Sequence, residues 1–193
     1  MVKIKICGLS RPCDVEAVNI EKSDYIGFVF APSRRRITPQ QALELRKELC
    51  PCIIPVGVFV DEEIENIISL IQNGIIDAVQ LHGSEDESYV RKLKTLTHKP
   101  IIKAITVQDK RMTAADYLML DSKGGGTGHS FDWNLVGTIE TPYFLAGGLS
   151  PENIEEAINR TNPFAVDVSS GVETDGFKDS VKVKEFIRRA RNE

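Results

Sequence analysis

Two side chains that can exchange protons stand at the ends of apolar segments. Cys7 ends the segment of residues 2–7, and Asp121 ends the segment of residues 116–121. A thiol and a carboxyl have ordinary pKa values near ~8.5 and ~3.9; a nearby positive charge would lower the first and a dry pocket would raise the second. The pair could then act as general base and general acid near neutral pH. The residues alone leave open a buried core cysteine and a helix-capping aspartate.

Two glycine-rich stretches towards the carboxyl terminus indicate a phosphate site. FLAGGLS contains Gly147 and Gly148, and VSSGVE contains Ser169, Ser170 and Gly171. Glycines let backbone N–H groups approach phosphate oxygens, and serine hydroxyls add further donors. Glycines that simply make tight turns are the alternative, but the signal occurs in both stretches, which favours phosphate binding.

Three further polar side chains need a role. His82, in VQLHGSE, ends another apolar segment. We assign it to substrate binding rather than to direct proton transfer, because a lone histidine at a strand end is often a hydrogen-bonding group. Strand alternation places Lys5 on the same face as Cys7, so a Lys5 that points inward needs a charged partner. Asp167 is the predicted partner, and we also count it with the substrate-binding residues.

The apolar segments that carry these residues alternate with helical patterns along the whole chain. Near-continuous apolar runs are typical of parallel strands that are buried on both faces. The count of eight, without a glycine-rich dinucleotide fingerprint after the first strand, favours a (β/α)8 TIM barrel over an open doubly wound sheet. We therefore predict an α/β fold with one compact barrel domain over residues 1–193. The predicted strands are residues 2–7, 25–31, 53–60, 75–83, 100–107, 116–121, 142–148 and 163–171.

Start signals predict several of the helices between these strands. The sequence TPQQ, which begins at Thr38, combines a capping box with a first-turn proline. Ser84 with Glu87 repeats the capping box, and Ser150 followed by proline opens another helix. Only eight residues, 108–115, separate the fifth and sixth strands. We expect the helix after the fifth strand to be missing or reduced to a turn.

Composition excludes several classes of function. The 193-residue chain has a formal net charge of −4 and one basic cluster, residues 34–36, and three arginines suit a small anion better than nucleic acid. No run approaches the roughly 18 apolar residues of a membrane helix. The start, MVKIKICG, has no signal-peptide pattern. We therefore expect a cytoplasmic protein with neither a nucleic-acid nor a membrane partner.

Cysteine usage supports the same compartment. Disulfide frameworks belong mainly to short secreted chains, so the four cysteines here indicate a reducing cytoplasm. Cys50-Pro51-Cys52 lacks the C-x₂-C spacing of a zinc site, and no histidine pair follows it. We expect no metal.

Seven motifs follow one another from residue 3 to residue 179. They are KICGLS, GFVFAPSRRRI, VQLHG, LMLDS, GGTGHSFDW, FLAGGLSPENI and VDVSSGVETDGFKD. Each is weakly specific alone, but KICG at the first strand together with DVSSGVE at the eighth is strongly specific. The series resembles that of the phosphoribosylanthranilate isomerase family of tryptophan biosynthesis.

The resemblance implies an Amadori rearrangement of a small phosphorylated substrate by a monomer or homodimer, with no cofactor or metal. N-(5-phosphoribosyl)anthranilate would become 1-(2-carboxyphenylamino)-1-deoxyribulose 5-phosphate. The family's general base falls on Cys7 and its general acid on Asp121. The arginine that holds the anthranilate carboxylate or orients the substrate falls on Arg35, with an arginine on each side of it. The loop that closes over the anthranilate falls on GGTG, which contains Gly126.

Other phosphosugar barrels are the alternatives. The histidine-pathway isomerase runs the same reaction type but resembles a duplicated half-barrel, with aspartate where this chain has Cys7. Indole-glycerol-phosphate synthase would need a catalytic lysine and glutamate pattern and a longer N-terminus. A catalytically inactive barrel that senses a phosphorylated ligand is a second class of function. The presence of both Cys7 and Asp121 speaks against it.

Overall fold

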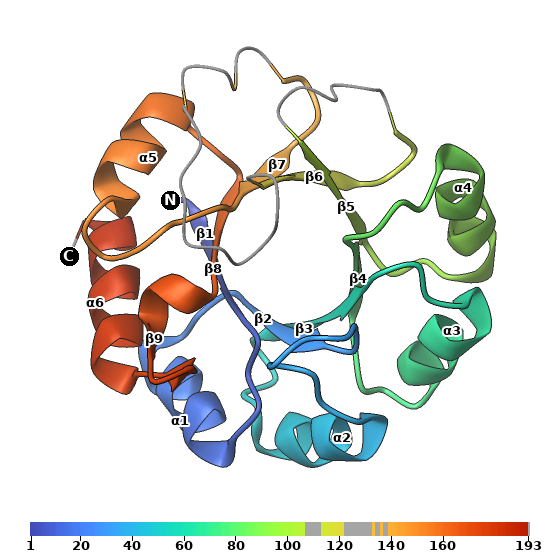
Figure 1. Ribbon diagram of the computed structural model, residues 1–193, viewed down its shortest axis with the longest axis horizontal. Coiled ribbons are helices and arrows are strands. Elements are labelled where there is room, and N and C mark those ends of the chain that lie inside the picture. Colours follow the sequence, from blue (N-terminus) through green and yellow to red (C-terminus); the bar gives the residue numbers. More distant parts are fainter. Residues whose placement is uncertain (107–112, 122–132, 134–135, 137–138, 193) are drawn as a thin grey trace.

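The chain folds into a closed barrel of eight parallel strands, in which the last strand pairs with the first (Figure 1). The computed structural model describes residues 1–106, 113–121, 133, 136 and 139–192. The predicted barrel is confirmed, and each predicted strand segment contains one observed strand. The strands are β1 (Lys3–Cys7), β2 (Tyr25–Val29), β3 (Ile54–Phe59), β4 (Ala78–Leu81), β5 (Ile101–Thr106), β6 (Tyr117–Asp121), β7 (Tyr143–Leu145) and β8 (Ala165–Val168).

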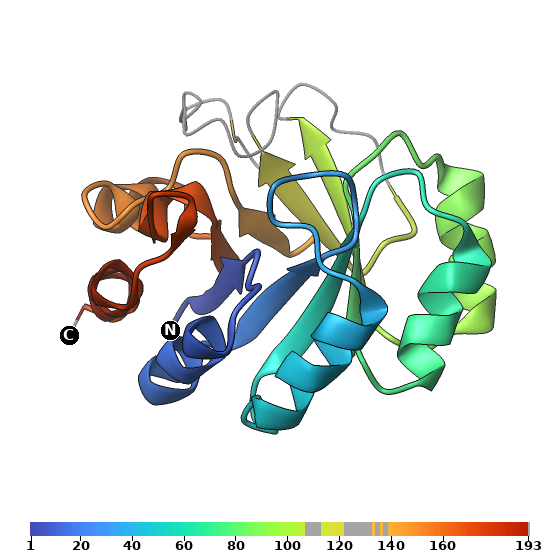
Figure 2. The ribbon, with the colours of Figure 1, turned by 60° about the horizontal axis from the view of Figure 1, so that its bottom comes forward.

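The helices pack on the outside of the barrel (Figure 2). They are α1 (Pro12–Glu21), α2 (Pro39–Glu48), α3 (Ile64–Gln72), α4 (Glu87–Leu96), α5 (Ile154–Thr161) and α6 (Ser180–Arg191). Between β5 and β6 the described residues, 113–116, include no helix, and the rest of the segment predicted to lack one, residues 107–112, lies outside the described residues. No helix in the described part of the chain is long and apolar enough to cross a membrane.

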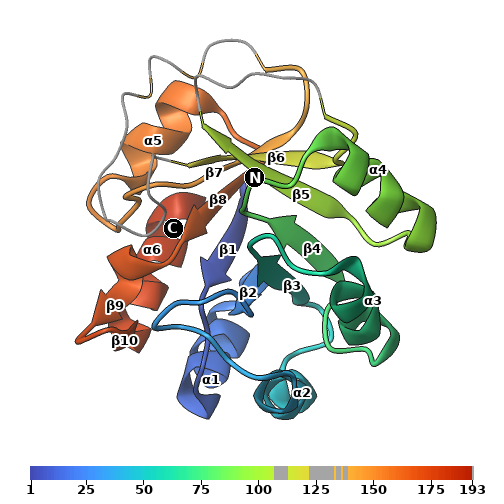
Figure 3. The same cartoon turned by 45° about the vertical axis from the view of Figure 1, so that its right-hand side comes forward.

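The segment between β8 and α6 has local structure that the sequence does not predict. A 3₁₀ turn, η2 (Ser170–Val172), follows β8 and leads into a short antiparallel hairpin, β9 (Glu173–Thr174) and β10 (Phe177–Lys178). Figure 3 shows this hairpin next to the start of α6. The hairpin brings two charged side chains, those of Glu173 and Lys178, into buried positions.

One predicted helix start is correct and a second is wrong. Thr38 caps α2 as predicted, and its Oγ1 accepts from the Gln41 N–H at 3.2 Å. The predicted box at Ser84 does not form, because the Ser84 hydroxyl donates to Asp61 at 2.9 Å instead. Helix α4 begins at Glu87, and the side chain of Asp86 caps it by accepting from the Tyr89 N–H at 2.8 Å.

The helix predicted to open at Ser150 begins later, at Ile154. The Ser150 N–H donates to the Asn153 Oδ1 at 2.9 Å, and the Ile154 N–H donates to the Ser150 carbonyl at 3.1 Å. These bonds close a separate turn over residues 151–153, which delays the first helical residue.

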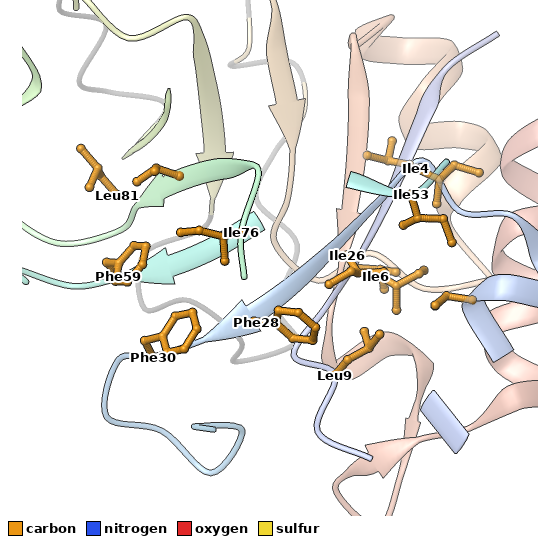
Figure 4. Close-up of a cluster of buried hydrophobic side chains, with 14 of the residues drawn as sticks. Ile4, Ile6, Leu9, Ile26, Phe28, Phe30, Ile53, Phe59, Ile76 and Leu81 are labelled. Carbon is orange, nitrogen blue, oxygen red and sulfur yellow. The ribbon is translucent and has the colours of Figure 1, made fainter. Parts of the chain in front are cut away.

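Apolar side chains fill two layers. An outer layer lies between the strands and the helices, where outward-facing strand residues such as Ile4, Ile26 and Phe28 are fully buried (Figure 4). The Phe30 and Phe59 rings stack in this layer, with their centroids 5.3 Å apart. An inner layer around Phe144 fills the barrel towards the amino ends of the strands. Each fully buried side chain of this size contributes roughly 1.5–3 kcal/mol relative to exposure, so the strand ends are held on a rigid frame.

Candidate active site

The carboxyl ends of the strands place most of the predicted functional residues at one mouth of the barrel. Cys7 ends β1, Asp121 ends β6, and His82 directly follows β4. One small cavity at this mouth joins the predicted acid to the predicted phosphate residues. It is lined by Asp121, Ala146, Gly147, Gly148, Leu149, Asp167, Ser169 and Ser170.

The Cys7 thiol is buried at the end of β1, and the neighbouring strand makes room for it. A Cβ atom at Gly27 on β2 would lie 2.6 Å from the Cys7 Sγ, so a larger residue at position 27 would displace the thiol. Burial raises the pKa of Cys7, against the opposing positive charges of Lys5 and Lys178. In the free protein Cys7 is therefore a protonated thiol at neutral pH, with two ammonium groups available to stabilise the thiolate once a proton leaves.

Lys5 and Asp167 form a buried ion pair inside the barrel, below Cys7. The β1–β8 register sets the two residues opposite each other, and the Lys5 Nζ lies 2.7 Å from the Asp167 Oδ1. The predicted pairing is confirmed. Burial alone would lower the pKa of Lys5, but the Asp167 and Cys7 interactions outweigh it and the pKa is raised. Lys5 thus stays charged.

Asp121 lies against a histidine, a contact that the sequence does not predict. The His82 Nε2 lies 3.2 Å from the Asp121 Oδ2, and the Gln80 amide nitrogen lies 2.8 Å from the His82 Nδ1. The imidazole of His82 thus bridges the Gln80 amide and the Asp121 carboxyl. The structure therefore places His82 on the predicted acid.

Two oxygen atoms beside this histidine have no partner. The Asp121 Oδ1 and the Gln80 Oε1 are buried without a hydrogen bond among the described residues. Buried polar atoms are nearly always paired in folded proteins. An unpaired carboxylate oxygen next to the cavity is therefore available to a bound molecule.

Of the three consecutive arginines, Arg35 is the one that faces the catalytic strand. Its side chain is 14% exposed, compared with 57% for Arg34. The guanidinium donates to both Glu173 carboxylate oxygens, at 2.6 and 2.9 Å. This pairing raises the pKa of Arg35, and the shaft of its side chain packs against Gly8 directly after Cys7. The sequence missed Glu173, since an acid in an irregular segment after β8 carries no pattern.

Glu173 also fixes Lys178, and Lys178 joins the phosphate loop to Cys7. The Lys178 Nζ lies 2.6 Å from the Glu173 Oε1 and donates to the Ser169 carbonyl at 3.0 Å. The Ser169 hydroxyl in turn donates to the Cys7 carbonyl at 3.1 Å. One buried carboxylate, that of Glu173, thus connects Arg35 with the loop after β8 and the end of β1.

The two glycine-rich loops touch each other, as a shared phosphate site requires. A Cβ atom at Gly171 would lie 1.9 Å from the Leu149 carbonyl oxygen, so only glycine lets the loop after β8 approach the loop after β7. Gly147 and Gly148 both have positive φ angles, of 86° and 65°. The predicted phosphate residues are therefore together, while Gly126 lies outside the described residues.

The described residues do not form a metal centre. No three histidine, cysteine, aspartate or glutamate side chains within them group as metal ligands. The polar groups at the mouth are instead one thiol, carboxylates, an imidazole and fixed cations. Such groups can transfer protons and bind anions.

Comparisons with known proteins point to one family. The family model for N-(5'phosphoribosyl)anthranilate (PRA) isomerase matches residues 4–189. The N-(5'-phosphoribosyl)anthranilate isomerase of Endomicrobium trichonymphae is 48% identical over 199 residues, which cover 100% of each chain.

Solved structures agree. A monomeric form of the dimeric phosphoribosylanthranilate isomerase of Thermotoga maritima aligns with a TM-score of 0.86, at 37% identity and over 100% of both chains. A phosphoribosyl anthranilate isomerase in complex with reduced 1-(o-carboxyphenylamino)-1-deoxyribulose 5-phosphate aligns with a TM-score of 0.85. It is 36% identical, and 100% of both chains is covered.

Proposed function

The chain belongs to the N-(5'-phosphoribosyl)anthranilate isomerase family, and from this premise we propose that it converts N-(5-phosphoribosyl)anthranilate to 1-(2-carboxyphenylamino)-1-deoxyribulose 5-phosphate in tryptophan biosynthesis. The observation that carries the proposal is the arrangement at the mouth. A buried thiol and a histidine-bound carboxyl end β1 and β6, and the carboxyl shares a cavity with two touching glycine loops.

The substrate would be held at its two anionic ends. We propose that the phosphate binds the amides and hydroxyls of Gly147, Gly148, Ser169, Ser170 and Gly171. Arg35 would face the anthranilate carboxylate, because its guanidinium is fixed by Glu173 near Cys7. The Asp167 Oδ1 is held by Lys5, which leaves the other oxygen to accept a hydrogen bond from a ribose hydroxyl.

The first chemical step is ring opening. Protonated Asp121 gives its proton to the ribose ring oxygen, the bond from that oxygen to carbon 1 breaks, and the anilino nitrogen lone pair forms a Schiff base. The unpartnered Asp121 Oδ1 is the oxygen that suits this transfer, because His82 already occupies Oδ2.

The second step moves a proton away from carbon 2. The Cys7 thiolate takes this proton, the electrons flow into the Schiff base, and an enolamine results. The enolamine then tautomerises to the ketone product. Lys5 and Lys178 favour the thiolate electrostatically, so Cys7 can act as a base although it is buried.

The proposal is tested by turnover of substrate generated in situ, followed by loss of its fluorescence. Cys7→Ser and Asp121→Asn should each lower kcat by roughly 10³-fold or more, while the affinity for the reduced product analogue is retained. Cys13→Ser, which alters an exposed thiol, should leave kcat unchanged. Analogue binding by the unaltered chain without any turnover would instead indicate a sensor of phosphorylated ligands. Full activity of Cys7→Ser would reject the thiol as the base.

We also propose that the protein works in the cytoplasm as a monomer or a homodimer. The four cysteines are all free, which suits a reducing compartment. Sedimentation of the purified chain distinguishes the two assembly states.

A further inference from the structure

A pair of thiols lies at the end of the barrel that is opposite the active-site mouth. Cys50 and Cys52 stand between α2 and the amino end of β3, and their Sγ atoms are 2.6 Å apart. Cys52 is exposed and Cys50 is half-buried. The isomerase mechanism uses neither side chain, since the reacting groups stand at the carboxyl ends of the strands.

The backbone holds the two thiols together. The Ile53 N–H donates to the Cys50 carbonyl at 2.9 Å, which closes a four-residue turn with Pro51 at its second position. Proline fixes φ at this position. Asn19 on α1 anchors the turn, because its Oδ1 accepts from the Cys50 N–H at 2.9 Å and its amide group donates to the Glu48 carbonyl at 2.8 Å. The turn therefore fixes the backbone positions of the two cysteines, whose sulfur atoms are in contact.

The surroundings favour sulfur chemistry over metal binding. A tetrahedral zinc site needs further ligands, and the described residues contain no group of three that includes these cysteines. The two thiols are also unequal. The contact between the two sulfur atoms lowers the pKa of Cys50 and raises the pKa of Cys52. Lys22 adds positive charge beside both.

We propose that Cys50 and Cys52 form a thiol–disulfide exchange site that reacts with small-molecule disulfides of the glutathione class. The Cys50 thiolate attacks one sulfur of the small disulfide, forms a mixed disulfide and releases the first small thiolate, which takes up a proton. The Cys52 thiol then loses its proton to water and attacks the Cys50 sulfur. This step releases the second small thiolate. Two protein thiols are thereby oxidised to one disulfide while one small disulfide is reduced to two thiols.

The test uses the full chain, reduced and then freed of reductant, with oxidised glutathione as the probe. Intact mass and peptide mapping should show that the segment containing Cys50 and Cys52 loses two hydrogen atoms and keeps no glutathionyl group. Cys13 is the internal comparison, since it is exposed and has no cysteine partner. We expect it to retain a glutathionyl group and to react at least about tenfold more slowly than Cys50.

Single substitutions separate the two steps. Cys52→Ser should trap glutathione on Cys50, because the second attack is lost. In Cys50→Ser, Cys52 should react with oxidised glutathione about as slowly as Cys13 does. Pro51→Gly should keep the first attack and accumulate the mixed disulfide, because the turn no longer holds the thiols together. Thermal unfolding of each variant checks that it is folded.

Two results would overturn the proposal. One is a stable glutathionyl adduct on Cys50 or Cys52 of the unaltered chain. The other is a disulfide that forms no faster than Cys13 is modified.

Discussion

At the scale of single residues, the proposed base is held in the protonation state opposite to the one it needs. Burial raises the pKa of Cys7 from 9.0, yet the base must be a thiolate. The thiolate is therefore a minor form of Cys7 in the free protein at neutral pH.

This arrangement predicts the pH at which the Cys7 thiolate forms in the free protein. Because burial raises the pKa of Cys7 from 9.0, the thiolate should appear only above pH 9. Ultraviolet absorbance of the thiolate, compared between the unaltered chain and Cys7→Ser, measures this titration. Lys178→Met should move it higher, since a positive charge that favours the thiolate is removed. A Cys7 thiolate that forms below pH 9 contradicts this account.

A second prediction concerns His82. His82→Asn removes the imidazole that contacts and orients Asp121, so kcat should fall by about 10- to 100-fold while KM changes little. Gln80→Met is the comparison. It removes the amide that contacts the His82 Nδ1 but keeps the imidazole ring. Steady-state kinetics should therefore show a smaller loss of kcat. If His82→Asn raised KM at constant kcat, His82 would be a substrate-binding residue as the sequence analysis assigns it.

At the scale of elements, the contact between the loops after β7 and β8 determines the shape of the phosphate site. Gly171→Ala would place a methyl group 1.9 Å from the Leu149 carbonyl oxygen, so the loops must separate. We expect at least about a tenfold higher Kd for the product analogue, measured by calorimetry.

Gly74→Ala is the matched control for this change. Gly74 ends α3 with a φ of 68°, and no atom lies within 4 Å of the added methyl group. Gly74→Ala should cost about 1 kcal/mol of unfolding free energy and leave the Kd unchanged. Equal effects of both alanines on the Kd would show that backbone strain, and not the loop contact, is responsible.

The same elements show what a sequence can and cannot predict. Apolar runs specify the strands, because strands buried on both faces need little else, and strand alternation correctly pairs Lys5 with Asp167 across β1 and β8. The capping signal at Ser84 is misleading because the Ser84 hydroxyl donates its hydrogen bond to Asp61, which is distant in sequence. A local motif cannot report such a competitor.

Side-chain contacts across the mouth are the part that the sequence could not supply. His82 follows β4 and Asp121 ends β6, and these strands are not neighbours, so no register links the two residues. Glu173 contacts Arg35 only because a short hairpin folds back towards that arginine. Both contacts depend on the packed geometry of the barrel.

At the scale of the whole molecule, the seam between β1 and β8 closes the barrel and carries a buried charge pair. Helices α1 and α6 reinforce the seam, where Arg191 donates to the Glu21 and Lys22 carbonyls at 3.1 and 2.7 Å. The Lys5–Asp167 pair at the centre of the seam is 162 residues apart in the chain.

Removal of one charge from this pair should be costly. Lys5→Met leaves Asp167 buried and unpaired, and we expect a loss of about 3–5 kcal/mol in the free energy of unfolding, measured with urea. Adding Asp167→Leu should recover most of that loss. Lys3→Met, which breaks the exposed pair with Asp24, should cost less than about 1 kcal/mol. Equal losses for both lysines would contradict a special role of the seam.

The pH dependence of this contribution follows from the direction of the Lys5 shift. The folded-state pKa is raised above 10.5, so the stabilisation is fully present below 10.5 and is lost as pH rises through the folded pKa. The seam pair therefore contributes its full stabilisation at neutral pH.

The 162-residue separation of Lys5 and Asp167 also sets the timing of the protein's synthesis. At translation rates of about 5–20 residues per second, the ribosome makes the partner of Lys5 on the order of ten seconds after Lys5 itself. Throughout that interval β1 has an open edge and a lysine that cannot be buried without its counter-charge. The nascent chain thus cannot complete its ring early, and its period of exposure to chaperones and to self-association lasts until the final strand and α6 have left the exit tunnel.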